Sequence, residues 1–278
     1  MVGLTYLLPV GLVRLLEYAR RFRALNLPPY FSLVQKYRLA LVESQLELVP
    51  SEQIASLKCV VDVGANLGSW CSGVACLTGA ERIIAYEPVP DVFNRLCENA
   101  KKYPQIRCVQ AAVGSSLGRV TVNVETAHEL SSVLAMRSDM RCEYGAGQDR
   151  SRQVEVPMTT LDEDLKEEDE ISLLKVDVQG YEREVFAGAR SVLRRTKVLM
   201  TEVLFASHYQ GDLQFGDLCQ LIQSTSHLNL WTVSKPSCAP SGRALWADAV
   251  FVQDVSSGST AYSCTTAGIS RVTPRQTQ

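Results

Sequence analysis

A glycine-rich turn that directly follows an apolar run is the feature that most constrains this fold. The apolar run 59–63 contains Asp62, and the turn over 64–68 reads Gly-Ala-Asn-Leu-Gly. A second apolar run, 82–86, is followed immediately by Glu87. A strand, a glycine turn, a helix and a second strand that ends in a carboxylate form a βαβ unit that holds an adenosine ligand. The sequence therefore predicts an α/β fold that binds a nucleoside cofactor.

The spacing of the glycines distinguishes between cofactors. A dinucleotide-binding turn has the pattern G-x-G-x-x-G, whose second glycine lets the backbone approach a pyrophosphate. Here Asn66 stands at that position between Gly64 and Gly68, and the acidic Asp62 would repel a diphosphate. S-adenosylmethionine carries an ammonium and a sulfonium group and no phosphate, so it suits this turn. Glu87 would then accept hydrogen bonds from both ribose hydroxyls.

A simpler alternative remains for each residue taken singly. The glycines could do no more than permit a tight turn, and Glu87 could be a solvated strand end. The order of the residues within one βαβ unit favours the cofactor interpretation.

Composition limits the other classes of function. The chain has 278 residues, of which 46% are hydrophobic, enough for one α/β domain with additions. A net charge of −2 and a pI near 6.0 show no basic excess, so no nucleic-acid partner is indicated. The nine cysteines are scattered without a C-x-x-C pair, which is typical of reduced thiols in a cytoplasmic protein and gives no zinc pattern.

Residues 1–57 precede the cofactor motif and predict a helical cap. The apolar stretch 4–16 is too short to cross a bilayer, which needs about 20 residues, and it lacks the basic start of a secretory signal. Apolar residues and arginines recur at helical spacing through 12–23, which suits a helix that packs on the domain or one that makes peripheral contact with a membrane. A second helix is expected over 32–48, where it would cover the sheet or the ligand. Its apolar stripe comprises Leu33, Tyr37, Leu41 and Leu48.

Strand and helix signals alternate through residues 58–255, which predicts a doubly wound, mainly parallel sheet. Helices are expected at 92–101, after a Pro-Asp start, and at 182–195. The expected strands are 59–63, 82–86, 106–111, 172–176, 198–203, 229–233 and 249–252.

An insertion over 125–152 interrupts the alternation. Exposed strands are expected on either side of it, at 119–124 and 153–156. Because loops at this edge of an α/β sheet surround the ligand, the insertion could be a lid or a substrate-recognition element, or else a plain surface loop. The Ser/Thr/Gly-rich stretch 256–278 reads as a flexible tail.

Three charged residues lie at the ends of two later predicted strands. Period-two alternation places Lys175 and Asp177 on one face, and Glu202 ends the next strand. Asp177 and Glu202 could position a nucleophilic hydroxyl or bracket a divalent metal. Alternatively, Asp177 pairs with Lys175 or caps the following helix. No residue is assigned as a metal ligand from the sequence.

These motifs, in this order, resemble the FkbM-type S-adenosylmethionine-dependent methyltransferases over residues 58–253. The resemblance implies a Rossmann-like methyltransferase fold with a seven-stranded sheet, its last strand antiparallel, and N-terminal helices added. It also implies methyl transfer to a hydroxyl of a sugar, lipid or other natural product. The matching segments are Asp62 to Gly68, Tyr86 to Pro88, Ala111 to Gly114, Thr160 to Asp162 and Leu174 to Glu182.

Carried over by position, the resemblance assigns the cofactor site. The cofactor loop comprises Asp62, Gly64, Asn66 and Gly68, Glu87 is the ribose acid, and Ala112 lies where backbone amides meet the adenine. The chain departs from the family at Gln179, where many members have glutamate. No acidic residue follows the third strand to accept a hydrogen bond from the adenine amino group.

We therefore expect an O-methyltransferase in which Asp177 positions or deprotonates the acceptor hydroxyl. Glu202 would assist directly or through a metal, and Lys175 would tune the local charge. His128 in the insertion is a rival base. Two other classes remain open: a non-catalytic S-adenosylmethionine-binding scaffold, which Gln179 would allow, and a nicotinamide-dependent oxidoreductase, which the glycine spacing disfavours.

Overall fold

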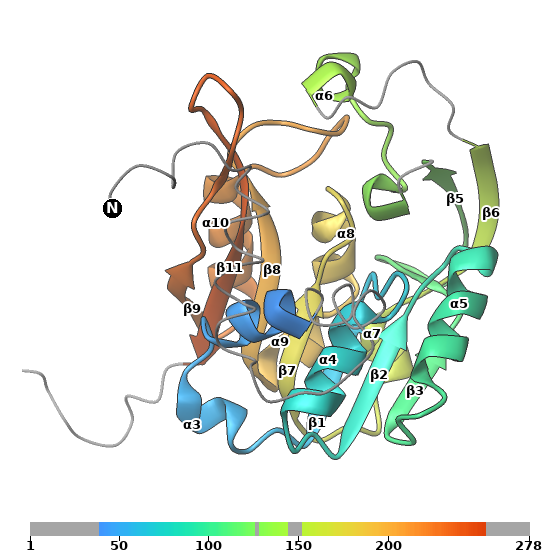
Figure 1. Cartoon of the computed structure of the whole chain (residues 1–278), viewed down its shortest axis with the longest axis vertical. Coiled ribbons are helices and arrows are strands. Elements are labelled where there is room, and N and C mark those ends of the chain that lie inside the picture. The colour runs from blue at the N-terminus through green and yellow to red at the C-terminus, as the bar shows by residue number, and fades with distance from the viewer. Residues whose placement is uncertain (1–38, 126–127, 144–151, 254–278) are drawn as a thin grey trace, which may run out of the picture.

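The computed structural model describes residues 39–125, 128–143 and 152–253 (Figure 1). The helix expected within 4–23, with its proposed membrane contact, and the tail over 256–278 lie outside the described residues. Among the helices that the structure does describe, none is long and apolar enough to span a bilayer.

The centre of the fold is an eight-stranded sheet in the order β10-β11-β8-β7-β1-β2-β3, with β9 paired to β11. The five adjacent strands β8, β7, β1, β2 and β3 run parallel to one another. In contrast, β11 is antiparallel to both β8 and β9. The predicted doubly wound, mainly parallel sheet with an antiparallel last strand is confirmed, and the eighth strand is the two-residue β10. The bounds are β1 Cys59–Val63, β2 Arg82–Tyr86, β3 Ile106–Val109, β7 Ile171–Val176, β8 Thr196–Leu204, β9 Leu228–Val233, β10 Ser237–Cys238 and β11 Ala244–Gln253.

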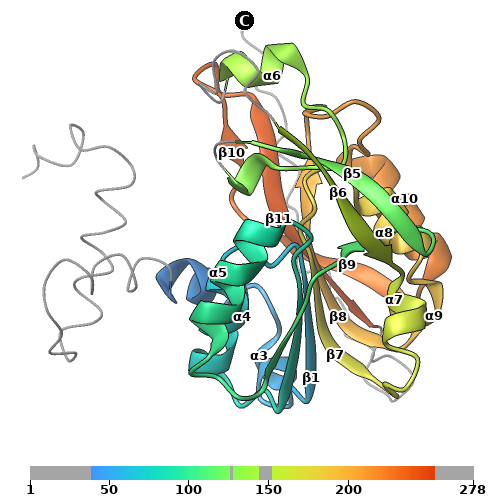
Figure 2. The ribbon, with the colours of Figure 1, turned by 90° about the vertical axis from the view of Figure 1, so that its right-hand side faces the viewer.

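Helices cover both faces of the sheet, as Figure 2 shows. One face carries α4 (Ser69–Leu77) and α5 (Pro90–Ala100), and Ile54 of the short α3 (Ser51–Ile54) packs into the apolar layer on the same face. The opposite face carries α7 (Leu161–Asp164), α8 (Glu182–Ala187), α9 (Arg190–Arg194) and α10 (Phe215–Thr225). Because both faces are covered, every residue of β1 and β7 is buried, which explains their continuous apolar runs.

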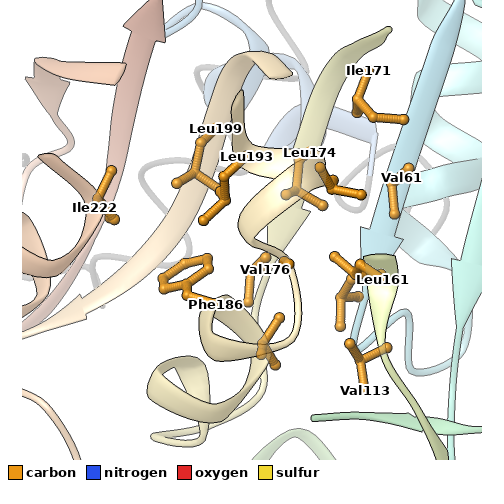
Figure 3. Close-up of a cluster of buried hydrophobic side chains, with 14 of the residues drawn as sticks. Val61, Val113, Leu161, Ile171, Leu174, Val176, Phe186, Leu193, Leu199 and Ile222 are labelled. Carbon is orange, nitrogen blue, oxygen red and sulfur yellow. The ribbon is translucent and has the colours of Figure 1, made fainter. Parts of the chain in front are cut away.

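The larger of the two apolar layers lies between the sheet and α7 to α10 (Figure 3). Phe186 of α8 is fully buried there, in the same cluster as Leu199 of β8 and Leu174 of β7. Period-two alternation sends Val61 into this layer and its neighbour Val60 into the layer beneath α4. Packing in the two layers fixes the register of the strands, and therefore which strand ends lie side by side.

One helix prediction was wrong: residues 182–195 form two short helices instead of one. The break falls at Gly188 and Ala189, between α8 and α9. A Cβ at Gly188 would lie 2.0 Å from the carbonyl oxygen of Gly114, so the backbones are in direct contact. This tertiary contact overrides the helical periodicity of the segment.

The N-terminal helix packs against α4. Residues 39–46 are helical, with Val42 and Leu46 buried and Leu41 40% exposed. Val42 contacts α4 at Gly73, where a Cβ would meet the valine Cγ2 at 2.7 Å. Of the predicted stripe, Leu41 is exposed and Leu48 packs against the core, while Leu33 and Tyr37 lie outside the described residues.

A smaller three-stranded sheet lies beside α5, at the upper right of Figure 1. It contains β4 (Ala112–Val113), β5 (Gly118–Val124) and β6 (Arg152–Thr159), and β5 and β6 pair in antiparallel fashion. The two strands predicted on either side of the insertion are thus confirmed. Between them, the short 3-10 helix His128–Leu130 and α6 (Ser138–Glu143) belong to the insertion itself.

Candidate functional site

A cavity of about 1350 Å³ opens at the carboxyl ends of β1, β2 and β7. Single-ligand pockets measure about 300–1,000 Å³, so this cavity has room for two bound molecules. Four parts of the chain form its wall: the turn after β1 with the ends of β2 and β4, the ends of β7, β8 and β11, residues 40–48, and residues 128–133. The crevice outside parallel strand ends is where ligands bind in sheets of this type.

The glycine turn requires glycine for two reasons at Gly64. Its φ is +84°, a backbone conformation that L side chains rarely adopt, and a Cβ there would lie 1.9 Å from the carbonyl oxygen of Asp177. Gly68 has φ +77° and begins α4, where a Cβ would meet Leu96 at 2.5 Å. Asn66 also has a positive φ of +50°, which asparagine tolerates. The turn is therefore a close-packed connection between β1, β7 and α4.

Glu87 is fastened to this turn by backbone donors. Its Oε2 accepts a hydrogen bond from the Asn66 N–H at 3.0 Å, and its Oε1 accepts one from the Val89 N–H at 2.9 Å. Burial raises the pKa of Glu87 to about 7, although both N–H donors act in the opposite direction. The carboxyl group lines the cavity and is oriented before any ligand arrives.

Asp62 lies behind the cavity wall. It is fully buried, and neither carboxylate oxygen has a hydrogen-bond partner of normal geometry within the described residues. Its nearest cation is Lys175, whose Nζ is 3.9 Å from Oδ1. Burial raises the pKa of Asp62 to about 6, partly offset by that cation.

The six predicted cofactor residues divide into two groups. Gly64, Asn66, Glu87 and Ala112 line the cavity, whereas Asp62 and Gly68 support the turn from behind.

The buried Lys175 and the partly exposed Asp177 form an ion pair at the end of β7. Lys175 Nζ lies 3.0 Å from Asp177 Oδ2 and 5.7 Å from the centre of the Trp70 ring. The sequence left open whether Asp177 pairs with Lys175 or caps the following helix. The structure shows the pairing with Lys175. The pairing leaves the other carboxylate oxygen, Oδ1, available for a second contact.

Gln179 makes that second contact. Its Nε2 donates to Asp177 Oδ1 at 2.9 Å and lies 3.4 Å from Glu202 Oε2. The amide therefore bridges the two acids that the sequence selected. All three side chains line the cavity, as does Lys175.

The environment drives the pKa values of the two acids apart. Burial alone would raise the pKa of Asp177, but the Lys175 cation and the hydrogen bonds from Lys175 and Gln179 hold it below its ordinary value. Burial and the nearby Asp177, Glu182 and Asp248 raise the pKa of Glu202 well above its ordinary value. A pair of acids separated in this way favours the ionised form of one carboxyl group and the protonated form of the other.

Two further polar residues of the wall were not selected from the sequence. Asp248 of β11 pairs in register with Glu202 and accepts a hydrogen bond from Gln45 Nε2 at 3.0 Å. Asp248 directly precedes the strand predicted over 249–252, which was the available signal. Nothing local could identify Gln45, because the contact spans 203 residues of sequence.

The rival base His128 lies in the insertion segment that lines the cavity. Its Nε2 is 3.4 Å from Arg95 Nη1, at an exposed position. The described part of the chain contains no group of three potential metal-binding side chains, and the seven cysteines whose side chains are described form no disulfide.

Comparisons with known proteins agree with this geometry. A family model described as the methyltransferase FkbM domain matches residues 62–228, more than half of the chain. The 2-O-methyltransferase NoeI of Sinorhizobium fredii is 25% identical over 173 residues, which are 59% of this chain and 71% of NoeI. The hexuronic acid methyltransferase AglP of Haloferax volcanii is 27% identical over 148 residues, which are 51% of this chain and 54% of AglP. The match thus spans about half of AglP.

Solved methyltransferase structures are also among the proteins that match this chain. TrmK of M. capricolum, in complex with S-adenosyl-homocysteine, is 8% identical with a TM-score of 0.46, covering 77% of this chain and 68% of that chain. Magnesium protoporphyrin IX methyltransferase from Synechocystis PCC 6803 is 8% identical with a TM-score of 0.45, covering 86% and 94% respectively.

Proposed function

The chain belongs to the FkbM methyltransferase family, and from that premise we propose that it methylates a hydroxyl group of a neutral, sugar-type acceptor. Its methyl donor is S-adenosylmethionine. The observation that carries the proposal is that one cavity contains both the Glu87 carboxyl group beside the glycine turn and the Asp177 carboxylate at the end of β7.

The residues around the turn fit S-adenosylmethionine. Gly64 leaves no room for a side chain at the closest approach, and Glu87 presents an acceptor for the ribose hydroxyls. Asn66 Oδ1 and Trp70 Nε1 are buried with no hydrogen-bond partner among the described residues, which is the condition of polar groups that await a ligand. Ala112 would lie against the adenine. When bound, the cofactor supplies a methyl group on a positively charged sulfur.

The residues at the end of β7 would handle the acceptor proton. Asp177 stays ionised beside Lys175, so it can accept a hydrogen bond from the acceptor hydroxyl and take its proton during transfer. The raised pKa of Glu202 favours its protonated form, which can donate a hydrogen bond to another oxygen of the acceptor. Lys175 balances the charge of Asp177 and of the buried Asp62.

The charge of the cavity wall favours a neutral acceptor. Beyond the glycine turn, six acids line the wall against two lysines, Lys175 and Lys235, and Lys175 is already engaged by carboxylates. An acceptor that carried its own carboxylate would face like charge. Trp246 and Tyr181 also line the cavity and offer aromatic surface to the apolar face of a sugar ring. The six acids are Glu43, Glu47, Glu129, Asp177, Glu202 and Asp248, of which Glu202 contributes least to the repulsion because its raised pKa favours the uncharged form.

The relatives support a sugar-type acceptor at the level of their names. NoeI is described as a 2-O-methyltransferase and AglP as a hexuronic acid methyltransferase. We place the methyltransferase domain at residues 58–255 and treat 1–57 as a cap, because residues 40–48 line the cavity. The insertion over 125–152 would contact the acceptor through residues 128–133.

Transfer of an isotopically labelled methyl group tests the proposal. The full chain is incubated with methyl-labelled S-adenosylmethionine and a panel of neutral glycosides, uronic acid glycosides, lipids and small alcohols, and products are identified by mass spectrometry. The account expects an O-methylated neutral sugar. Binding of the cofactor without transfer to any hydroxyl would instead indicate a cofactor-binding scaffold.

A further inference from the structure

Gln179 has an unusual backbone conformation next to the proposed catalytic acid. Its φ is +56°, in the left-handed region that few residues other than glycine occupy. Such conformations persist where surrounding contacts fix them, and they are frequent at functional sites. The hydrogen bonds of the Gln179 side chain indicate the role of this backbone conformation.

The amide of Gln179 contacts both acids of the site. One Nε2 proton is donated to Asp177 Oδ1 at 2.9 Å, and the other points towards Glu202 Oε2 at 3.4 Å. On the other side of the amide, Oε1 accepts a hydrogen bond from the Tyr209 hydroxyl at 2.9 Å. An ionised carboxylate only accepts hydrogen bonds, so the observed orientation of the amide, with Nε2 towards Asp177, is the one that makes this contact.

The backbone of Gln179 is held by the insertion. Ser132 Oγ donates to the Gln179 carbonyl oxygen at 2.7 Å. The Tyr209 hydroxyl also lies 3.3 Å from the carbonyl oxygen of Leu130. Both contacts come from the segment 128–133 that lines the cavity, so the insertion and the acid at the end of β7 are joined through one residue.

We propose that Gln179 is a positioning residue for methyl transfer, which holds the Asp177 carboxylate in one orientation towards the acceptor and separates it from Glu202. The proposal rests on the function proposed above, because it assigns the acceptor hydroxyl to Asp177. Gln179 itself touches the acid and acts through it. Nothing in the role requires Gln179 to exchange a proton.

A glutamate could not take this role in the present surroundings. After burial, the charge of Asp177 raises the pKa values of four surrounding acids, and Lys175 is the cation that faces it. The four acids are Asp62 of β1, Glu202 of β8, Asp248 of β11 and Glu182 of α8. Replacing the donated hydrogen bond by another carboxylate would add repulsion where one cation already serves two anions. The amide provides donors without adding charge.

Three substitutions separate positioning from a purely structural role. Gln179→Gly suits the left-handed backbone and removes the amide, so the melting temperature should hold while kcat falls about 100-fold, the usual cost of a misplaced catalytic group. Gln179→Glu should also move the acidic limb of the kcat–pH profile upward by about one unit, because a neighbouring carboxylate raises the pKa of Asp177. Gln220 is exposed on α10 and does not line the cavity. Gln220→Glu makes the same change of charge there, so its kcat and kcat–pH profile should match those of the wild type.

Tyr209→Phe provides a further variant in which the backbone of Gln179 is untouched. It removes the hydroxyl that fixes the amide, so kcat should fall while the affinity for S-adenosylhomocysteine stays unchanged. Should the Gln179 variants fail to fold, the kcat of Tyr209→Phe alone tests the positioning role of Gln179.

Two results would overturn the inference: wild-type kcat in Gln179→Gly or Tyr209→Phe, or an unmoved acidic limb in an active Gln179→Glu. Asp177→Asn measured in parallel separates this failure from the failure of the proposed function. If Asp177→Asn has lost turnover and Gln179→Gly has not, only the positioning role fails. If Asp177→Asn turns over normally, the assignment of Asp177 fails, and the positioning role fails with it.

Discussion

The carbonyl oxygen of Asp177 occupies the space that a side chain at Gly64 would need, 1.9 Å from the position of its Cβ. In addition, the Asp177 N–H donates to the Val63 carbonyl oxygen at 3.0 Å. These backbone contacts fasten the turn that would hold the methyl donor to the strand end that would hold the acceptor. The relative placement of the two substrates is therefore a property of the backbone, and proximity of this kind is a large part of catalysis in group transfer.

Gly64→Ala should disrupt this junction. A non-glycine residue at φ +84° costs about 1–3 kcal/mol, and the clash with a backbone oxygen adds about 1–3 kcal/mol. We expect a large fall in the free energy of unfolding, measured by urea denaturation, and loss of cofactor binding. Gly216→Ala in α10 is the control, because a Cβ there meets nothing and alanine favours a helix. Equal free energies of unfolding in Gly64→Ala and Gly216→Ala would contradict the close backbone contact between Gly64 and Asp177.

Cofactor affinity should depend on pH through Glu87. Its pKa in the free protein is about 7, raised by burial from 4.5, and the ionised form is the one that accepts hydrogen bonds from the ribose. Affinity for S-adenosylhomocysteine, measured by calorimetry, should therefore rise about 10-fold from pH 6 to pH 8.

The same shift has the opposite effect on stability. The folded protein binds the Glu87 proton more tightly than the unfolded chain, so the contribution of Glu87 to stability is present below pH 4.5 and is lost as pH rises to about 7. Glu87→Gln should bind the cofactor more weakly and with little dependence on pH. Retention of the full pH dependence in Glu87→Gln would exclude Glu87 as its source.

Much of the cofactor half of the site could be predicted because its signals are local. The turn after β1 and the acid after β2 lie within one βαβ unit, where strand ends and spacing determine geometry. The Lys175–Asp177 pair was also accessible, since period-two alternation places both residues on one face.

The acceptor half depends on contacts between distant segments. Gln45 reaches Asp248 across 203 residues, and Tyr209 reaches Gln179 across 30, so no local pattern reveals either pair. The break in the helix expected over 182–195 has the same origin, since it reflects a backbone contact with Gly114. Periodicity reports burial and does not report which distant backbone lies beside a residue.

Acceptor charge should govern selectivity. We expect kcat/KM for a neutral hexoside to exceed that for the matching hexuronide by about 10-fold or more, because the added carboxylate meets an acidic wall. Asp248→Asn retains an oxygen for the Gln45 amide and removes one acid from the wall. It should therefore reduce the difference in kcat/KM between the hexoside and the hexuronide. Steady-state kinetics with the matched pair of acceptors measures both effects. A preference for the hexuronide would contradict a neutral acceptor.

The apolar layer shown in Figure 3 should dominate stability. Phe186 is fully buried among strands and helices, so Phe186→Ala should lower the free energy of unfolding by about 3–5 kcal/mol. Leu117 is 62% exposed, and Leu117→Ala should change it by less than about 0.5 kcal/mol. Thermal and urea unfolding of the two variants give the comparison. Similar losses in both would show that the layer is not the principal source of stability.

Single-turnover methyl transfer by Asp177→Asn tests the central claim most directly. The variant is mixed with saturating methyl-labelled S-adenosylmethionine and an accepted neutral sugar, alongside the wild type and the exposed control Asp169→Asn. The account predicts a rate about 100-fold or more below that of the wild type, as loss of a general base causes, with unchanged affinity for S-adenosylhomocysteine. A wild-type rate in Asp177→Asn would contradict it.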